Sequence, residues 1–340
     1  MKTLALASAL LAPFLLAAEP VGIIFDTDML TDVDDAGALA CLHALADAGE
    51  ARILATVSST SGNASVGAVQ VINTYYGRGG LPVGSPKGAG VRGDVPRPGM
   101  KPHHGAPLGG GHAKYRRLLA NHPGWYTCAD ADDAPDATEV YRRTLASQPD
   151  RSVVVCTTGF LTNIRLLLES KGDAHSPLDG RALAAKKVKL WVAMACRYPR
   201  GREFNAMIDR ESSRVALDDW PTPIVFADWN LGADVFAGRK IVESGNTGNP
   251  VRELFAASLP AGNGRSAWDE LAVLIAVRGV ERYFNANRGR YRMTGEDGSC
   301  EWIDAENSPH VRATAKIPKA ELGRMIDELI CRAPKSLGGE

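Results

Sequence analysis

Residues 21–42 read VGIIFDTDMLTDVDDAGALACL, and this stretch decides the fold and directs attention to one site. The apolar run at 21–25 is rich in β-branched residues, which is typical of a buried parallel strand. Apolar residues then recur at helical spacing over 36–48, so a helix is predicted directly after the strand. Between the two elements lie five carboxylates: Asp26, Asp28, Asp32, Asp34 and Asp35.

The density of these carboxylates predicts a bound cation. Two carboxylates about 4 Å apart repel by about 4 kcal/mol at an effective dielectric constant of about 20, so the cluster requires a counter-ion. A hard divalent cation with oxygen ligands meets this need. Asp34 and Asp35 could instead cap the helix N-terminus, but capping gives no role to Asp26 and Asp28 on the strand side.

The rest of the chain alternates between strand-like and helical patterns. Strand-like runs occur at 52–58, 81–84, 152–158, 188–194 and 223–228. Helical patterns occur at 64–76, 137–146, 161–169, 210–217, 251–258, 268–277 and 319–331. Such alternation predicts an α/β fold of the Rossmann-like kind, with a mostly parallel central sheet and helices on both faces. We expect residues 19–340 to form one domain.

The composition excludes several classes of function. The chain has 340 residues, of which 45% are hydrophobic, and this is enough for a large core. The formal net charge is zero and the basic residues are spread along the chain, so no nucleic-acid surface is predicted. The expected partner is a small molecule, and a homo-oligomer stays open.

The first 18 residues have the layout of a secretory signal peptide. One lysine precedes an apolar stretch at 4–16 that is too short to cross a bilayer, and small residues follow at Ala17 and Ala18. We therefore expect cleavage after Ala18 and an exported protein, periplasmic or secreted. No other stretch approaches 18 apolar residues, so no membrane association is expected after cleavage.

Six cysteines in an exported chain permit up to three disulfides. Three lie inside apolar patterns and are predicted to be small core residues: Cys41, Cys156 and Cys196. The other three could pair or remain free: Cys128, Cys300 and Cys331. No cysteine or histidine spacing indicates zinc.

Four further segments place polar residues at strand ends or at a helix start. They read SGNA at 61–64, CTTGFLTNIRLLL at 156–168, REFNAMID at 202–209 and SAWDELAVL at 266–274. Together with the opening acids they resemble the nucleoside hydrolase family, the inosine-uridine preferring N-ribohydrolases. The family's DxDxxxDDA motif is similar to DTDMLTDVDDA here, which has two extra residues, and its TGPLTNI motif matches with Phe160 in place of proline. Order and spacing agree over about 21–277.

The resemblance implies a calcium-dependent hydrolase that cleaves the N-glycosidic bond of nucleosides or related N-ribosides. It implies that Ca²⁺ is held by Asp28, Asp35, Asp269 and the main-chain carbonyl of Thr158. The residues implied to grip the ribose are Asp34, Asn63, Met194, Glu203 and Asn205. Asp28 would accept a proton from the water that attacks C1′ of an oxocarbenium-like transition state.

Two departures from the family pattern bear on the site. Because of the extra residues, Asp32 stands at the interval where the family has its next acid, so it competes with Asp34 for the sugar. Trp268 stands where many members carry a histidine that protonates the leaving base, and an indole cannot donate a proton usefully. Stacking on Trp268, or a donor such as His104 in the loop at 92–111, would then assist the leaving group, or the substrate would carry a leaving group that departs without help.

Two other functions account for part of the pattern. A haloacid-dehalogenase-like phosphatase also begins with a DxD strand end, but Leu30 stands where that family expects threonine or valine. A catalytically weak, calcium-dependent nucleoside- or sugar-binding protein of the same fold would explain Trp268. Ribose-forming turnover distinguishes this binding protein from the enzyme.

Overall fold

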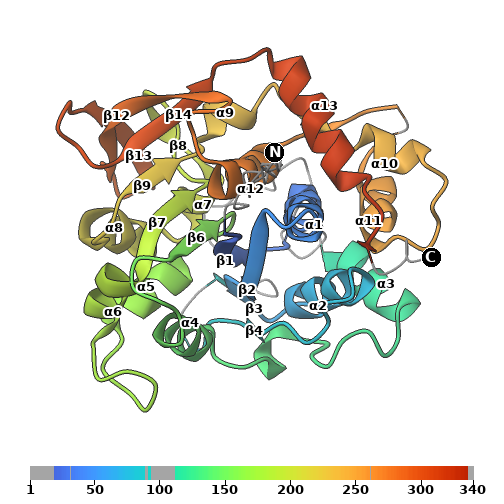
Figure 1. Ribbon diagram of the computed structural model, residues 1–340, viewed down its shortest axis with the longest axis horizontal. Helices are drawn as coiled ribbons and strands as arrows, with labels where there is room; N and C mark the ends of the chain where they lie inside the picture. Colours follow the sequence, from blue (N-terminus) through green and yellow to red (C-terminus); the bar gives the residue numbers. More distant parts are fainter. Residues whose placement is uncertain (1–18, 31, 89–90, 93–111, 261, 336–340) are drawn as a thin grey trace, which may run out of the picture.

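The first predicted strand lies inside a ten-stranded sheet, third from one edge (Figure 1). The computed structural model describes residues 19–30, 32–88, 91–92, 112–260 and 262–335. The parallel part of the sheet consists, in spatial order, of β4 (Val83–Gly84), β2 (Ala51–Ser58), β1 (Val21–Thr27), β6 (Val153–Thr157), β7 (Val188–Ala193), β9 (Ile224–Phe226) and β14 (Val311–Ala315). These strands confirm the predicted parallel core of the fold.

An antiparallel extension follows β14 at one edge of the sheet. It consists of β12 (Phe284–Met293), β13 (Ser299–Asp304) and β8 (Arg200–Arg202). The sequence patterns did not predict these strands, since their outward positions carry arginine and asparagine rather than an apolar run. Two short pairs stand outside the main sheet: β3 (Thr60–Ser61) with β5 (Val91–Arg92), and β10 (Phe236–Ala237) with β11 (Arg265–Ser266).

Helices cover both faces of the sheet, as predicted. Successive strand residues point to opposite faces, so Ile23 and Phe25 join one buried cluster while Ile24 joins the other. The first cluster lies under α1 (Asp34–Asp47), α2 (Ser65–Tyr75), α3 (His112–Asn121), α9 (Trp229–Gly232), α10 (Arg239–Glu243), α11 (Pro250–Ser258), α12 (Trp268–Arg278) and α13 (Lys319–Ile330). The second lies under α4 (Ala137–Ala146), α5 (Thr162–Glu169), α6 (Gly180–Lys187), α7 (Phe204–Ile208) and α8 (Arg210–Asp219).

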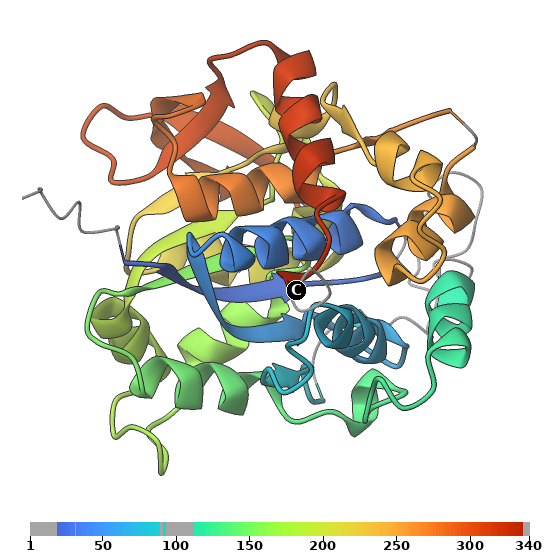
Figure 2. The ribbon, with the colours of Figure 1, turned by 45° about the vertical axis from the view of Figure 1, so that its right-hand side comes forward.

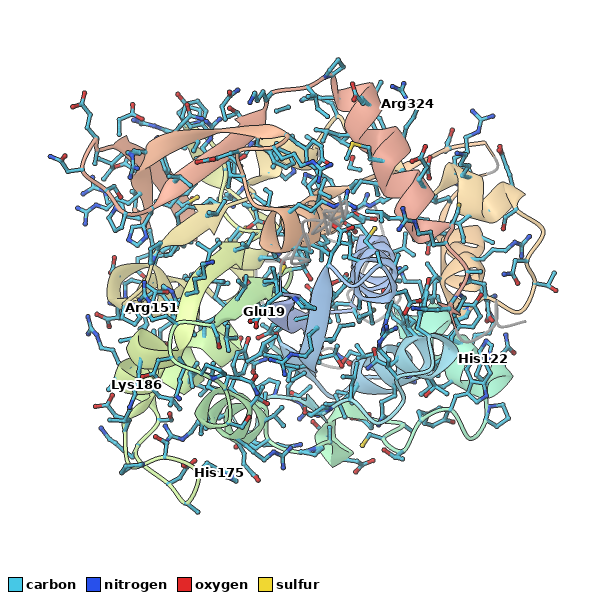
Figure 3. The ribbon with its side chains drawn as sticks, viewed as in Figure 1. Glu19, His122, Arg151, His175, Lys186 and Arg324 are labelled. Atoms are coloured by element: carbon cyan, nitrogen blue, oxygen red, sulfur yellow. The ribbon has the colours of Figure 1, made fainter. Side chains whose placement is uncertain are left out.

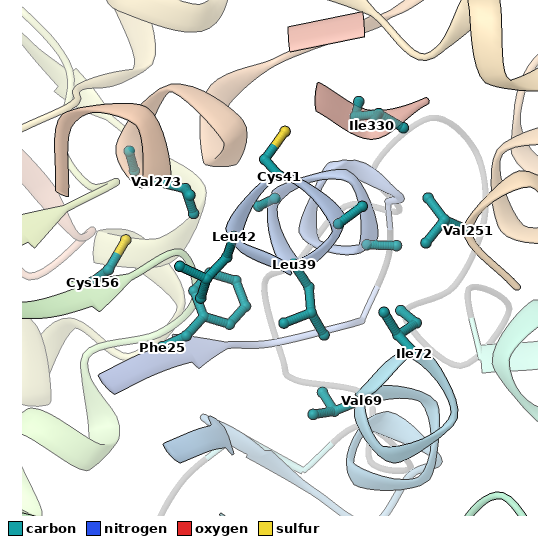
Figure 4. Packing of buried hydrophobic residues seen from close by; sticks show 14 of the residues in the cluster. Phe25, Leu39, Cys41, Leu42, Val69, Ile72, Cys156, Val251, Val273 and Ile330 are labelled. Carbon is teal, nitrogen blue, oxygen red and sulfur yellow. The ribbon is translucent and has the colours of Figure 1, made fainter. Parts of the chain in front are cut away.

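Helix α1 is surrounded by other elements. Every residue from Asp34 to Leu45 is buried, because the sheet lies on one side of α1 and α12 and α13 pack beside it (Figure 2). Figure 4 shows Leu42 of α1 pointing toward Phe25 of β1. A helix that is apolar on all sides requires such an enclosed position. The two acids at its start are therefore held inside the protein.

Charged side chains outside the buried acidic cluster include several on the surface. Figure 3 shows Lys186, His175 and Arg324 at the periphery, and each is exposed. Within the part of the chain that the structure describes, no helix combines the length and apolar character needed to cross a membrane. The predicted signal peptide at 1–18 and the loop histidines His103 and His104 lie outside the described residues.

Candidate active site

The carboxyl ends of three neighbouring strands meet at one edge of the sheet. Asp28 follows β1, Thr158 follows β6, and Met194 follows β7. The backbone N–H of Thr158 donates to the carbonyl oxygen of Asp26 at 2.7 Å, and that of Met194 donates to the carbonyl of Thr157 at 2.8 Å. This register places the three residues side by side, at the edge where α/β sheets bind ligands.

A pocket opens at this edge of the sheet. Acids, one arginine and three aromatic rings form its wall. Its lining residues are Asp28, Asp32, Asp34, Asp35, Thr158, Met194, Glu203, Phe204, Asn205, Trp229, Arg265, Trp268 and Asp269. Among these described residues there is no histidine.

The backbone around Asp28 is closely packed. A Cβ atom on Gly159 would lie 2.6 Å from the Asp28 nitrogen, so only glycine allows the β6–α5 turn to approach this closely. Met29 adopts a left-handed backbone conformation with φ of 44° and directs the chain away from the strand. Burial raises the pKa of Asp28 well above its usual value, and the charges of Asp35 and Asp32 raise it further.

Asp34 and Asp35 form the first turn of α1 without capping it. The residue before the helix is Val33, and no side-chain cap hydrogen bond forms there. The hydroxyl of Thr27 donates to Asp35 Oδ1, whereas Asp34 Oδ1 is buried without a hydrogen-bond partner. Burial, followed by the charge of Asp32, raises the pKa of Asp35 to about 6. The capping alternative therefore does not explain these two acids.

Arg265 supplies a positive charge inside the pocket. Its guanidinium pairs with Asp32, and its Nε lies 3.7 Å from Asp34 Oδ1. The same guanidinium lies over the ring of Trp268, 4.9 Å from the ring centroid. Arg265 therefore neutralises part of the acidic cluster.

Glu203 and Asn205 form the wall opposite the acids. The carboxylate of Glu203 accepts backbone hydrogen bonds from Asn205 at 2.9 Å and from Cys196 and Ala206 at 3.0 Å each, so it caps the short helix α7. Burial raises its pKa to about 7. The amide of Asn205 donates to the carbonyl oxygen of Thr158 at 3.0 Å. The segment after β7 is thereby tied to the strand end of β6.

Two tryptophans line the remaining wall. Trp229 begins α9 and Trp268 begins α12, and their ring centroids lie 6.2 Å apart at an interplanar angle of 32°. A Cβ atom on Gly232 would lie 2.4 Å from Trp268 Cδ1, so glycine at this position allows the indole to pack against α9. The two rings offer an apolar, polarisable surface next to the acids, as an aromatic ligand requires.

The residues present fit a hard cation. Carboxylate oxygens of Asp32, Asp34 and Asp35 lie within 4.8 Å of one another, and the orphaned Asp34 Oδ1 has an unused lone pair inside the protein. Main-chain carbonyls and carboxylates are the ligands that Ca²⁺ and Mg²⁺ take. The acidic cluster is therefore compatible with metal binding.

Comparison with known proteins identifies the family. A family model described as inosine-uridine preferring nucleoside hydrolase matches residues 23–322. The chain belongs to this nucleoside hydrolase family. The resemblance inferred from the motifs is confirmed, and this nucleoside hydrolase acts on N-glycosyl compounds, with a small-molecule nucleoside as its substrate class. No curated protein matches the chain in sequence.

Solved structures of low sequence identity share the fold. The effector protein XOO4466 has a TM-score of 0.67 at 14% identity, and the alignment covers 94% of this chain and 95% of that one. The plant nucleoside hydrolase PpNRh1 has a TM-score of 0.63 at 17% identity, with 92% and 99% covered. The inosine-uridine preferring nucleoside hydrolase from Bacillus anthracis has a TM-score of 0.60 at 12% identity, with 91% and 99% covered. Because the family model matches residues 23–322, the phosphatase alternative is not retained.

Most of the sequence-predicted site residues line one pocket in this nucleoside hydrolase. They are Asp28, Asp34, Asp35, Thr158, Met194, Glu203, Asn205, Trp268 and Asp269. Asn63 does not line it, because its amide group donates to Thr60 and to the Ser61 carbonyl and accepts from the Ser65 N–H. His104 lies outside the described residues.

Sequence reasoning missed Arg265, Trp229 and Phe204. Trp229 directly follows the strand predicted at 223–228, so the rule that ligands bind at strand ends could have found it. Arg265 lies on the short strand β11, which reaches the site only by pairing with β10. No local pattern in the sequence indicated that contact.

Proposed function

We propose that this protein is a calcium-dependent hydrolase of nucleosides or related N-ribosides in which Asp28 activates the attacking water. The observation that carries the proposal is the convergence of Asp28, Asp35, Asp269 and Thr158 on one pocket. These four would hold the ion, and all are oxygen donors. When bound, Ca²⁺ would lower the pKa of a water molecule and orient the ribose diol.

Asp28 is the proposed general base. It lies at the end of β1 in a buried, tightly packed turn, so its carboxylate is held in one position. A carboxylate held there can accept the proton of a water that attacks C1′. The neighbouring carboxylates of Asp34 and Asp35 would stabilise the positive charge that develops on the sugar ring.

The ribose-binding wall is proposed to consist of Glu203, Asn205, Asp34 and Met194. The amide of Asn205 is 3.1 Å from the Met194 carbonyl, so the sugar side of the pocket forms one hydrogen-bonded unit. Asn63, in contrast, uses its amide to hold the start of α2. We therefore assign Asn63 a positioning role, in which it joins β3 to the start of α2.

The leaving base is proposed to lie against Trp229 and Trp268. An aromatic base stacks on such rings with about 1 to 3 kcal/mol of stabilisation in nucleic-acid sites. Among the described pocket residues, only Arg265 carries a side-chain cation. Its guanidinium stays protonated, so it can stabilise negative charge but cannot transfer a proton usefully.

A turnover assay with matched variants tests the proposal. The protein lacking residues 1–18 is loaded with Ca²⁺ and incubated with inosine, uridine, adenosine and p-nitrophenyl riboside, and free ribose is measured. We expect ribose release from at least one of them and its loss in Asp28→Asn, with Asp150→Asn, at a surface carboxylate outside the pocket, as the control for removing one carboxylate. Binding of nucleosides without any ribose release would instead support the binding-protein alternative.

A further inference from the structure

Two thiols lie together behind the pocket wall that carries Glu203. Cys196 lies in the segment that follows β7, and Cys300 lies on β13. Both side chains are fully buried in the same hydrophobic cluster. The two residues are far apart in the sequence, so the fold alone brings them together.

The backbone contacts of Cys300 fix its position next to Cys196. The sulfur of Cys300 accepts a hydrogen bond from the backbone N–H of Arg197, the residue after Cys196, at 3.4 Å. Its thiol also faces the carbonyl oxygen of Gly201 at 3.4 Å. Cys196 directly precedes Arg197, so its buried side chain lies in the same part of the hydrophobic cluster as the sulfur of Cys300. Cys300 of β13 is also paired with Gly201 of β8 in the sheet.

We propose that Cys196 and Cys300 form a disulfide bond when the chain folds in an oxidising compartment. The oxidant is a small disulfide such as oxidised glutathione. The two thiols lose their protons, an S–S bond forms between the two Sγ atoms, and the glutathione disulfide is reduced to two glutathione thiols. Export, which we expect from residues 1–18, would supply such a compartment.

The bond is expected to form before the fold is complete. In the folded protein, burial raises the pKa of the Cys196 thiol, and its neighbour Cys300 raises it further. Because the thiolate is the reactive species, a fully buried thiol reacts slowly with added oxidants or reductants. The bridge is therefore a lasting cross-link in the folded enzyme.

The other described cysteines have different surroundings. The thiol of Cys41 faces the carbonyl oxygen of Ile326, and that of Cys128 faces the carbonyl of Asp133. Cys331 is partly exposed near the end of α13. Cys331 therefore serves as a control, since its replacement leaves the proposed bridge intact.

The bridge would stabilise the wall of the pocket. The backbone N–H of Cys196 donates to Glu203 at 3.0 Å, and its carbonyl accepts from the Trp229 N–H at 3.0 Å. A covalent link to β13 therefore restrains the segment around Cys196. This segment positions Glu203 on the sugar side of the pocket and Trp229 on the side of the leaving base. This consequence rests on the proposed function, whereas the existence of the bond does not.

Counting thiols in the denatured chain tests the bond without any activity assay. The full chain is folded with a mixture of reduced and oxidised glutathione, denatured in guanidinium and treated with N-ethylmaleimide before any reductant. We expect four of the six cysteines to be modified, and a peptide containing Cys196 to be linked to one containing Cys300. Six modified cysteines, or a link between other residues, would overturn the proposal.

Matched variants separate the bridge from a general effect of cysteine removal. Cys300→Ser should leave five modifiable thiols, and Cys331→Ser should leave three together with the intact bridge. The melting temperature of the wild type and of Cys331→Ser should fall by several degrees when the chain is folded under reducing conditions, because the closed loop is long. Cys300→Ser should show no such difference, and an equal fall in that variant would contradict the proposal.

Kinetics then test the effect on the pocket. The reduced wild type should show a several-fold higher KM with a smaller change in kcat, because the bridge positions the pocket wall and takes no part in the chemical step. An unchanged KM would refute the effect on the wall. A bridged protein that cleaves no riboside would leave the disulfide standing and refute the proposed function.

Discussion

The indole N–H of Trp268 donates a hydrogen bond of 2.8 Å to the main-chain carbonyl oxygen of Trp229. This bond uses the one polar hydrogen of the side chain, so Trp268 can offer a leaving base only its ring. The backbone of Trp229 thereby fixes how the second ring faces the pocket. Leaving-group assistance from Trp268 must come from stacking, and not from a hydrogen bond or a proton.

The first prediction concerns the substrate's leaving group. General acid catalysis contributes about 10²- to 10⁴-fold, and the described pocket residues include no histidine. We therefore expect inosine to be cleaved slowly and p-nitrophenyl riboside, which has a good leaving group, to be cleaved efficiently. Equal kcat values for the two substrates, maintained in His103→Ala and His104→Ala, would exclude a defect in leaving-group activation.

Replacing Trp268 tests the same point from the protein side. Trp268→His should raise kcat for inosine relative to p-nitrophenyl riboside, since an imidazole can donate a proton. Trp268→Phe is the matched control, because it keeps an aromatic ring and removes the indole N–H that bonds to Trp229. If Trp268→Phe shifts the substrate ratio as much as Trp268→His, the effect comes from packing and not from proton donation.

The second prediction separates chemistry from sugar binding. Asp28→Asn should abolish hydrolysis, because it removes the proposed base and a ligand charge. Asn205→Ala should mainly raise KM, since it removes neutral hydrogen bonds worth about 0.5 to 1.5 kcal/mol each, and more where the Thr158 carbonyl is left unpaired. Steady-state kinetics on both variants check this. Activity in Asp28→Asn comparable to that of the wild type would refute the mechanism.

The third prediction concerns metal removal. Without an ion, the buried acids repel one another, so Ca²⁺ should stabilise the folded state by mass action. A chelator should lower the melting temperature, and elemental analysis should find one Ca²⁺ per chain. An unchanged melting curve together with no bound metal would remove the basis for a calcium site.

The fourth prediction gives the pH dependence of this site. The pKa of Asp35 in the folded, metal-free protein is about 6, because burial and then the charge of Asp32 raise it. A raised pKa means that the unfolded chain loses this proton at lower pH than the folded one. The stability contribution of the group is therefore present below about pH 4 and is lost as the pH rises to about 6. Metal-free protein should become less stable over that range.

Metal binding should show the opposite pH dependence. The ion displaces the proton from Asp35, so the affinity for Ca²⁺ should fall by about tenfold per pH unit below 6 for each carboxyl that holds a proton. Calorimetry in two buffers of different ionisation enthalpy measures the protons released. An affinity that is the same at pH 5 and pH 7 would contradict the pKa shift.

Residues that lie next to regular elements could be predicted from the sequence, whereas tertiary contacts could not. Asp28 and Thr158 follow apolar strands, and Asp269 lies in the first turn of an apolar helix, so local patterns indicate their places. The role of Asn63 was inferred from resemblance, but its amide group is used by hydrogen bonds within 60–65. The position of Arg265 depends on how β11 pairs with β10, and no periodic pattern in the sequence predicts this pairing.

The last prediction concerns Arg265, which acts as the internal counter-ion of the acidic cluster. Its side chain is 18% exposed, and it pairs with Asp34 at 3% and Asp32 at 37% exposure. Removing one partner of a fully buried pair costs about 3 to 5 kcal/mol, and solvent around Asp32 reduces that cost. We therefore expect Arg265→Met to lower the unfolding free energy of the metal-free protein by about 1 to 3 kcal/mol.

Calcium should compensate for this loss. In Arg265→Met the acidic cluster carries one more uncompensated negative charge, so it attracts Ca²⁺ more strongly. Ca²⁺ should therefore raise the melting temperature of this variant more than that of the wild type. Arg239→Met is the matched control, since Arg239 pairs with Glu243 on the surface, where both side chains are more than half exposed. Thermal melts with and without Ca²⁺ provide the measurement. If Ca²⁺ shifts the melting temperatures of all three proteins equally, Arg265 and the ion do not act on the same carboxylates, and the assignment of Arg265 as their counter-ion fails.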